Sequence, residues 1–109
     1  MQRTFIRLAS FLKSWQALGL GEDAYATLED MLLLNPQVGA VIEGSGGIRK
    51  VRFALPGKGK SGSVRVIYVD IVVDETIYML YAYPKSVKEN LSKAEIANFK
   101  KIVDFLKKS

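Results

Sequence analysis

Apolar residues recur at helical spacing in the first third of the chain, after a possible short strand at residues 4–8. The apolar face of the first predicted helix consists of Phe11, Trp15 and Leu18, at positions i, i+4 and i+7. This helix is expected to end near residues 19–21. A second helix is predicted over residues 22–34, and Pro36 ends it because the residue before a proline is pushed out of the α region.

The middle of the chain has the pattern of strands. Residues 48–55 alternate, and their positions divide into two sides: Arg49, Val51 and Phe53 on one, Lys50 and Arg52 on the other. Residues 64–73 are rich in β-branched side chains and apolar on both faces, which indicates a central strand. Residues 77–83 read as another central strand, and Asp74-Glu75 predicts a tight turn between the two.

The last predicted helix begins at a capping box, in which Ser92 is followed three residues later by Glu95. Its buried stripe consists of Ile96, Phe99, Val103 and Leu106. The element order is therefore β-α-α-β-β-β-α within a single domain, residues 1–109. Three consecutive strands with short connections predict an α+β fold, with an antiparallel sheet packed against helices.

Composition narrows the chemistry that this chain can perform. The 109 residues include no cysteine and no histidine. Serine–histidine, cysteine–histidine and two-histidine acid–base catalysis are therefore excluded, and zinc lacks its usual ligands. We expect no metal and no cofactor. The longest purely aliphatic run is Met31–Leu34, so no membrane span is expected and a cytoplasmic location is predicted.

Positive charge is concentrated between Gly44 and Val69. This stretch has six basic residues and no acidic one, +6, whereas the whole chain carries +5. Residues 1–43 sum to −2 and residues 70–109 to +1. A polyanionic ligand, nucleic acid above all, explains such a concentration. A basic face without a partner is the alternative.

The basic stretch contains the loop Gly57–Gly62, Gly-Lys-Gly-Lys-Ser-Gly. It matches the dinucleotide-binding pattern G-x-G-x-x-G, but that site needs a following helix, and a strand is predicted here. Lys58 and Lys60, together with backbone amides, could instead contact phosphates. A flexible hairpin connection is the other interpretation.

Arg65 begins the apolar central strand and shares a face with Ile67, Val69, Ile71 and Val73. Burying a guanidinium without a partner is unfavourable. It could reach solvent or pair with a carboxylate such as Asp74 or Glu89. Alternatively, it is a rigid cation at the rim of a cleft, where it would bind a phosphate with two hydrogen bonds.

Aromatic and basic side chains follow on the last two strands and beyond. The tyrosines are Tyr68, Tyr78, Tyr81 and Tyr83. Most are expected to pack in the core, and one at a cleft edge could stack on a base. Lys85 and Lys88 either close the cleft opposite the glycine loop or are ordinary surface lysines.

Three motifs in order combine these features: Gly46-Gly47-Ile48-Arg49-Lys50-Val51-Arg52, Gly57-Lys58-Gly59-Lys60-Ser61-Gly62 and Arg65-Val66-Ile67-Tyr68. They resemble the RelE/HigB superfamily of bacterial toxins, and more narrowly the HigB branch. The flanking motifs agree: Leu33-Leu34-Asn35-Pro36, Ile42-Glu43-Gly44 and Tyr83-Pro84-Lys85. The resemblance implies the same order of elements and a toxin that cleaves mRNA in the ribosomal A site.

The resemblance also implies roles for single residues and partners. The catalytic candidates that it gives are Arg65, Lys50 and Lys85, and it gives Arg52 as an RNA-binding candidate. The basic stretch and the tyrosines of the last strands add Arg49, Lys58, Lys60 and Tyr83 as RNA-binding candidates. The implied partners are mRNA on the ribosome and a cognate helix-turn-helix antitoxin that covers the basic cleft. Two positions depart from the family: Ser86 stands where several relatives have an arginine, and Leu91 or Ser92 stands where RelE has a tyrosine.

The implied chemistry suits a chain without histidine. Attack by a 2′-hydroxyl on the adjacent phosphate creates a phosphorane with extra negative charge, which fixed cations stabilise. The proton donor could be Tyr68, Tyr81, Tyr83 or Lys85. The departures at Ser86 and Leu91 leave a second hypothesis, a non-catalytic RNA- or ribosome-binding module that blocks translation by occupancy.

Overall fold

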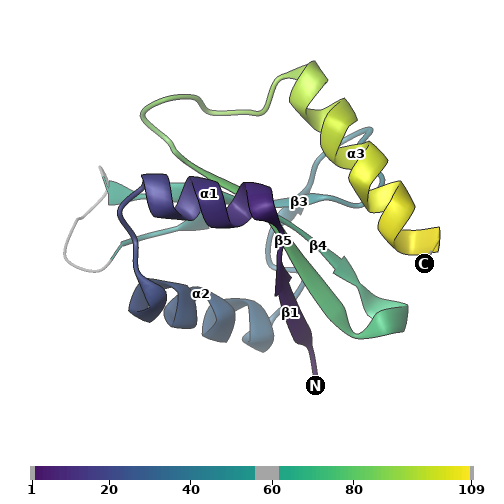
Figure 1. The fold of residues 1–109 in the computed structure, drawn as a ribbon, viewed down its shortest axis with the longest axis horizontal. Helices are drawn as coiled ribbons and strands as arrows, with labels where there is room; N and C mark the ends of the chain where they lie inside the picture. The colour runs from purple at the N-terminus through teal and green to yellow at the C-terminus, as the bar shows by residue number, and fades with distance from the viewer. Residues whose placement is uncertain (1, 56–61, 109) are drawn as a thin grey trace.

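The computed structural model describes residues 2–55 and 62–108 and arranges them around a five-stranded sheet (Figure 1). The strands are β1 (Thr4–Arg7), β2 (Ala40–Val41), β3 (Arg49–Phe53), β4 (Val64–Ile71) and β5 (Thr76–Pro84). The helices are α1 (Ala9–Ala17), α2 (Glu22–Leu34) and α3 (Lys93–Lys108). The predicted α+β class is confirmed, and the predicted order holds with β2 as an additional strand.

The strands lie in the order β1-β5-β4-β3-β2. The meander of β3, β4 and β5 is antiparallel, as predicted, and β2 extends it in the same sense, but β1 joins β5 in parallel. A parallel pair needs a long connection, and here residues 8–75 lie between the two strands. Strand β2 was not predicted, because two exposed residues carry no periodic signal.

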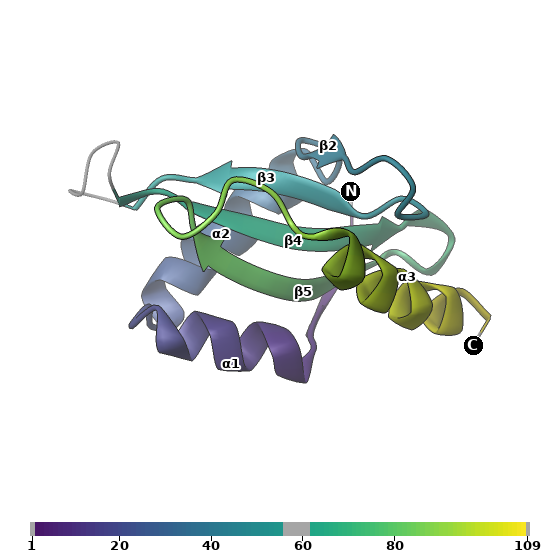
Figure 2. The same cartoon turned by 90° about the horizontal axis from the view of Figure 1, so that it is seen from above.

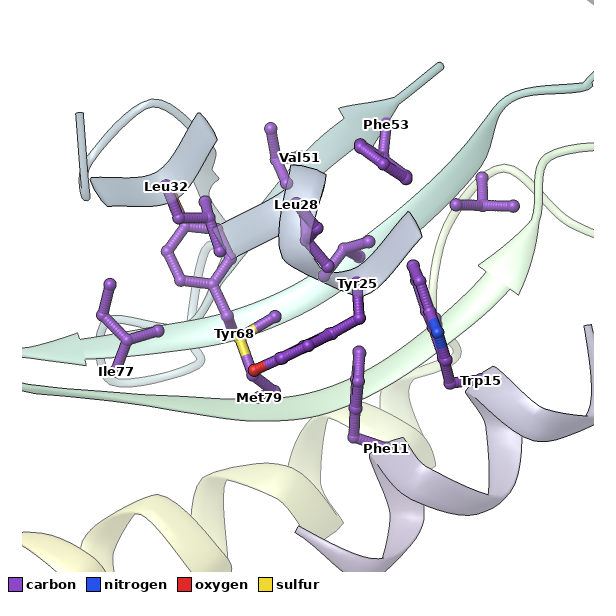
Figure 3. Close-up of a cluster of buried hydrophobic side chains, with 13 residues drawn as sticks. Phe11, Trp15, Tyr25, Leu28, Leu32, Val51, Phe53, Tyr68, Ile77 and Met79 are labelled. Atoms are coloured by element: carbon purple, nitrogen blue, oxygen red, sulfur yellow. The ribbon is translucent and has the colours of Figure 1, made fainter. Parts of the chain in front are cut away.

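Helices cover both faces of the sheet, and Figure 1 shows α2 and α3 on opposite sides. On one face, side chains of α1 and α2 form a core with those of the strands (Figure 3). Phe11 stacks on Trp15 at 5.3 Å between ring centroids, and Trp15 meets Tyr25 edge to face at 6.1 Å. On the other face, Phe99 and Val103 of α3 pack against Ile67 and Val69. We call this second face the α3 face.

Strand β5 has an irregularity that changes which side chains reach the α3 face. Ile67 is opposite Tyr81 and Tyr68 is opposite Met79, so Leu80 is an extra residue between the two pairs. Leu80 and Tyr81 consequently both belong to the α3-face cluster. Such a bulge shifts the alternation by one residue. It brings Tyr81, and after it Tyr83, onto the α3 face.

Strand β4 ends earlier than its sequence predicts. It stops at Ile71, and Val72–Asp74 form a 3₁₀ turn in which Val73 is 88% exposed. Glu75 then adopts a left-handed conformation with φ of 51°, which completes the predicted turn. The expectation that Val73 lies on the same face as Arg65 was therefore wrong, because the strand turns before reaching it.

Tyr68 is a core residue that fastens the connection after α2. Its hydroxyl donates to the Pro36 carbonyl and accepts from the Gly39 amide, both at 2.9 Å. A Cβ on Gly39 would lie 3.0 Å from both the Tyr68 ring and the Lys50 carbonyl oxygen, so any other residue would force one of them to shift. The hydroxyl is thus fully engaged and has no route to a ligand.

The predicted capping box forms at the start of α3. The Glu95 amide donates to the Ser92 hydroxyl, and the Ser92 amide donates to the Glu95 carboxylate. Of the predicted buried stripe, Phe99 and Val103 are buried, and Ile96 and Leu106 are half-buried. Within residues 2–55 and 62–108, no helix has the length and apolar character needed to span a membrane.

Candidate functional site

Two rows of side chains cross the sheet at the end where β4 begins. Arg52 of β3, Arg65 of β4 and Tyr83 of β5 are opposite one another. In the next row on the same face, Lys50 and Tyr81 flank Ile67. Directly opposed residues have their Cβ atoms about 5 Å apart. The sheet therefore brings together three basic residues and two tyrosines that are distant in sequence.

Arg65 is at the centre of this arrangement and is only 7% exposed. Its Nη2 donates to the Glu89 carboxylate at 2.9 Å. Its Nη1 is buried and has no hydrogen-bond partner among the described residues. Of the carboxylates that the sequence suggested, the partner is thus Glu89 and not Asp74. The pair satisfies Nη2 and leaves the buried Nη1 with an unused hydrogen-bonding capacity that an anion could take up once it reaches the guanidinium.

Glu89 belongs to residues 85–92, the crossover segment, which joins β5 to α3. Figure 2 shows this stretch passing over the sheet before α3 begins. The Tyr83 hydroxyl donates to the Glu89 carbonyl at 3.2 Å. Lys50 donates to the Asn90 side chain, with a longer contact of 3.4 Å to the Glu89 carbonyl. The same segment therefore engages Arg65, Tyr83 and Lys50.

The local charges act on the ionisable groups of the site. The hydrogen bond from Arg65 lowers the pKa of Glu89, and the charges of Lys85 and Lys50 add to this effect. Burial raises the pKa of Tyr83 to about 12, against a smaller opposing effect of Arg65. The Tyr83 hydroxyl consequently keeps its proton at neutral pH and can act as a hydrogen-bond donor.

Lys88 and Lys85 lie at the β5 end of the crossover segment. The Lys88 ammonium is 5.5 Å from the ring centroid of Tyr81 and 5.3 Å from that of Tyr83. It also forms an ion pair with Glu95 at the start of α3. Lys85 is exposed, and its charge helps to lower the pKa of Glu89. Both lysines therefore add positive charge near the Arg65 row.

A groove lies beside the site, between α1 and the end of β5. Its volume is about 470 Å³, and residues lining it include Ser14, Leu18, Tyr81, Tyr83 and Val87. Its walls are mostly apolar and aromatic. A planar base flanking a phosphate at Arg65 could enter this groove, because aromatic side chains are the usual surface for stacked bases.

Not every predicted site residue joins the cluster. Arg49 lies on the opposite sheet face, where its guanidinium donates to the Gln37 carbonyl at 3.1 Å and the Gly39 carbonyl at 2.6 Å. It supports the connection between α2 and β2. Lys58 and Lys60 lie outside the described residues.

Sequence reasoning missed parts of the crossover segment. Asn90 carries no sequence signal as a partner of Lys50, because exposed asparagines are common in connections. Leu91, at a departure from the family pattern, is 8% exposed and packs in the α3-face core. In the described part of the chain, no three acidic side chains gather as a metal site would require.

Comparisons with known proteins agree with this fold. A family model described as the RelE toxin of the RelE/RelB toxin–antitoxin system matches residues 38–109. A mutant of the E. coli toxin RelE in the free state is 18% identical, with a TM-score of 0.58, and the match covers 82% of this chain and 90% of that one. The same mutant in complex with a RelB antitoxin peptide is 19% identical, with a TM-score of 0.53 and coverage of 84% and 100%.

Proposed function

This chain belongs to the RelE toxin family of toxin–antitoxin systems, and from that premise we propose that it inhibits translation by ribosome-dependent, metal-independent cleavage of mRNA. We place it in the HigB-like branch on its sequence motifs. The observation that carries the proposal is the buried Arg65, which lies in a row with Arg52 and Tyr83 and whose Nη1 has no partner among the described residues. A buried guanidinium with an unused donor is suited to a phosphate.

In the proposed reaction, the 2′-oxygen of one nucleotide forms a bond to the adjacent phosphorus, and the bond from phosphorus to the 5′-oxygen of the next nucleotide breaks. The 2′-hydroxyl loses its proton and the leaving 5′-oxygen gains one. Arg65 binds a non-bridging oxygen and stabilises the extra negative charge of the phosphorane. Lys50 and Lys85 add positive charge, and Arg52, Lys58 and Lys60 hold the flanking phosphates.

The structure reduces the set of candidate proton donors. Tyr68 is excluded, because both partners of its hydroxyl are backbone groups of the core. Tyr83 has a protonated hydroxyl next to Arg65 in the sheet, and Lys85 follows it in the chain. We therefore assign the donor role to Tyr83, with Tyr81 and Lys85 as the alternatives. Positioning of the mRNA by the ribosome would supply a large further part of the rate.

The proposed partners are mRNA on the ribosome and a cognate antitoxin, in a cytoplasmic setting. The solved relative in which an antitoxin peptide is bound supports the antitoxin. An antitoxin of the helix-turn-helix class would cover the basic cleft and exclude RNA from it.

A second function is a non-catalytic module that blocks translation by occupying the ribosome. The buried Leu91 favours it, because the position where RelE has a tyrosine is part of the core here. The two functions predict the same binding and differ only in whether the RNA is cut.

The test uses purified protein with ribosomes programmed by a defined mRNA, read by primer extension. We expect cleavage on the ribosome, little on free RNA, and no effect of EDTA at levels that spare the ribosome. Arg65→Met is the matched control, since it keeps an apolar side chain of similar length. Magnesium-dependent cutting of free RNA would contradict the proposed chemistry, and ribosome binding without any cut would favour the occupancy module.

A further inference from the structure

We propose that the Glu89 carboxylate occupies the place of the substrate phosphate on Arg65, so that RNA binds by exchange with a segment of the protein itself. This inference rests on the proposed function, because it takes the ligand to be an RNA phosphodiester. The contact between Glu89 and Arg65 then represents a closed state of the site.

The contact with Glu89 uses only part of the hydrogen-bonding capacity of Arg65. The Arg65 side chain is nine-tenths buried and donates from Nη2 to one carboxylate oxygen at 2.9 Å, while Nη1 has no partner in residues 2–55 and 62–108. A guanidinium can bind two oxygens of one anion side by side. A single-oxygen contact leaves that capacity half used. The Glu89 side chain is 56% exposed, so it comes from the solvent side and covers the approach to Arg65.

The crossover segment contacts other residues of the site besides Arg65. The groups expected to meet RNA are each engaged by the crossover segment: Lys50 by the Asn90 side chain and Tyr83 by the Glu89 carbonyl. Lys88 lies over the tyrosine rings and pairs with Glu95. RNA cannot use Arg65, Lys50 and Tyr83 fully while these contacts persist. Displacement of one segment would free all three groups together.

The crossover segment belongs neither to the sheet nor to α3. Between Pro84, where β5 ends, and Lys93, where α3 begins, it has neither helix nor strand. It is held at its two ends, by the buried Leu91 and by the Lys85 amide, which donates to the Ser63 carbonyl at 3.5 Å, and between them by the polar contacts above. The Lys50 contacts are exposed and contribute little each, whereas those of Arg65 and Tyr83 are part-buried. No helix or strand has to be broken for residues 86–90 to move off Arg65.

Competition by Glu89 lowers the apparent affinity of the site for any phosphate, in proportion to the fraction of molecules in which Arg65 is free. A phosphodiester that the ribosome holds in place competes better with Glu89 than one on a free strand, because its effective concentration is higher. The closed contact therefore reduces binding to free RNA and favours RNA that is already positioned.

The test measures binding of a short 2′-O-methylated RNA, which cannot be cleaved, at fixed ionic strength. Glu89→Gln removes the competing charge and keeps the side chain's shape. Glu43→Gln is the control, because it changes the net charge equally at an exposed position before β3. We expect Glu89→Gln to tighten binding about three- to tenfold beyond the control. In an Arg65→Met background this gain should disappear.

The inference is overturned if Glu89→Gln binds no tighter than Glu43→Gln, or if its gain persists without Arg65. Glu89→Ala serves as a second variant, with melting temperatures confirming that each protein folds. Failure of the proposed function has a different signature: wild-type protein that leaves mRNA intact on ribosomes, or Arg65→Met that binds the methylated RNA as wild type does.

Discussion

Arg52 and Arg65 are directly opposite each other on β3 and β4, so the sheet holds two cations in one cross-strand pair. Like charges in this relationship destabilise a sheet by up to about 1 kcal/mol. Glu89 offsets part of the repulsion from the side of the crossover segment. The arrangement is therefore unfavourable for folding alone and favourable for binding an anion.

The first prediction follows from this pair. Arg52→Thr keeps a good strand former and removes the repulsion, so we expect unchanged or higher stability, by at most about 1 kcal/mol. Binding to the methylated RNA should weaken, and the slope of log affinity against log salt should decrease by about 1, since one phosphate contact is lost. Thermal melts and binding at several salt concentrations measure both effects.

Arg49→Met provides the contrast, from the same strand but the opposite face. Its guanidinium holds the Gln37 and Gly39 carbonyls. We expect it to lower stability by about 1–2 kcal/mol, because bonds from a charged donor are lost. The salt slope should stay that of wild type. A reduced slope in Arg49→Met would return this residue to the RNA-binding set that its sequence suggested.

The second prediction concerns Arg65. Arg65→Met should abolish cleavage and lower the melting temperature by no more than a few degrees, because it removes the ion pair with the exposed Glu89 side chain but keeps an apolar stem in the sheet and removes a buried donor without a partner among the described residues. Arg65→Lys should restore only part of the activity, since lysine keeps the charge and loses the planar fork. Cell growth after brief induction, together with primer extension, measures this. A folded Arg65→Met protein with full toxicity would exclude Arg65 from the reaction.

Elements with local signals could be predicted from this sequence, whereas contacts between distant segments could not. Helix α2 runs from Glu22 to Leu34 as predicted, because local signals mark both of its ends. The bulge at Leu80 has no such signal, since it depends on how β5 meets β4. Likewise, the sequence named Asp74 and Glu89 as possible partners of Arg65, and only the path of the crossover segment decides between them.

The role of the charged residues could likewise be predicted from the sequence only in part. The sequence correctly placed Lys50 and Arg52 on one side of the strand and Arg49 on the other, because alternation is a local property. Which side carries the site depends on where α3 packs, and that contact is distant in sequence. The roles of Lys58 and Lys60 stay predictions.

The third prediction separates two buried tyrosines. Tyr83→Phe removes the assigned proton donor, so cleavage should fall about 10²- to 10⁴-fold, with a small effect on stability because one hydrogen bond of 3.2 Å is lost. Single-turnover cleavage on ribosomes and thermal melts measure the two quantities. Cleavage at the wild-type rate would transfer the donor role to Tyr81 or Lys85.

Tyr68→Phe is its control. It leaves a buried amide and a buried carbonyl without partners, which should lower stability by about 1–3 kcal/mol. Cleavage below the melting range should be unaffected. The two substitutions thus have opposite profiles, although each removes one hydroxyl from the same sheet.

The last prediction concerns acid. The pKa of Glu89 lies below the ordinary value of 4.5, chiefly because Arg65 donates to its carboxylate, with Lys85 and Lys50 nearby. A carboxyl whose pKa is lower in the folded state stabilises the fold above its unfolded pKa, and this contribution is lost as pH falls through the folded pKa. The melting temperature of wild type should therefore exceed that of Glu89→Gln near neutral pH.

This difference should shrink once the pH falls below 4.5 and vanish below the folded pKa of Glu89. Glu95, whose pKa is also lowered, chiefly by Lys88, titrates in both proteins and cancels from the comparison. The advantage of Glu89→Gln in binding the methylated RNA should decline over the same range, because a protonated Glu89 no longer competes for Arg65. A melting difference that stays constant down to the most acidic pH at which both proteins fold would show that the Arg65–Glu89 pair contributes no charge interaction.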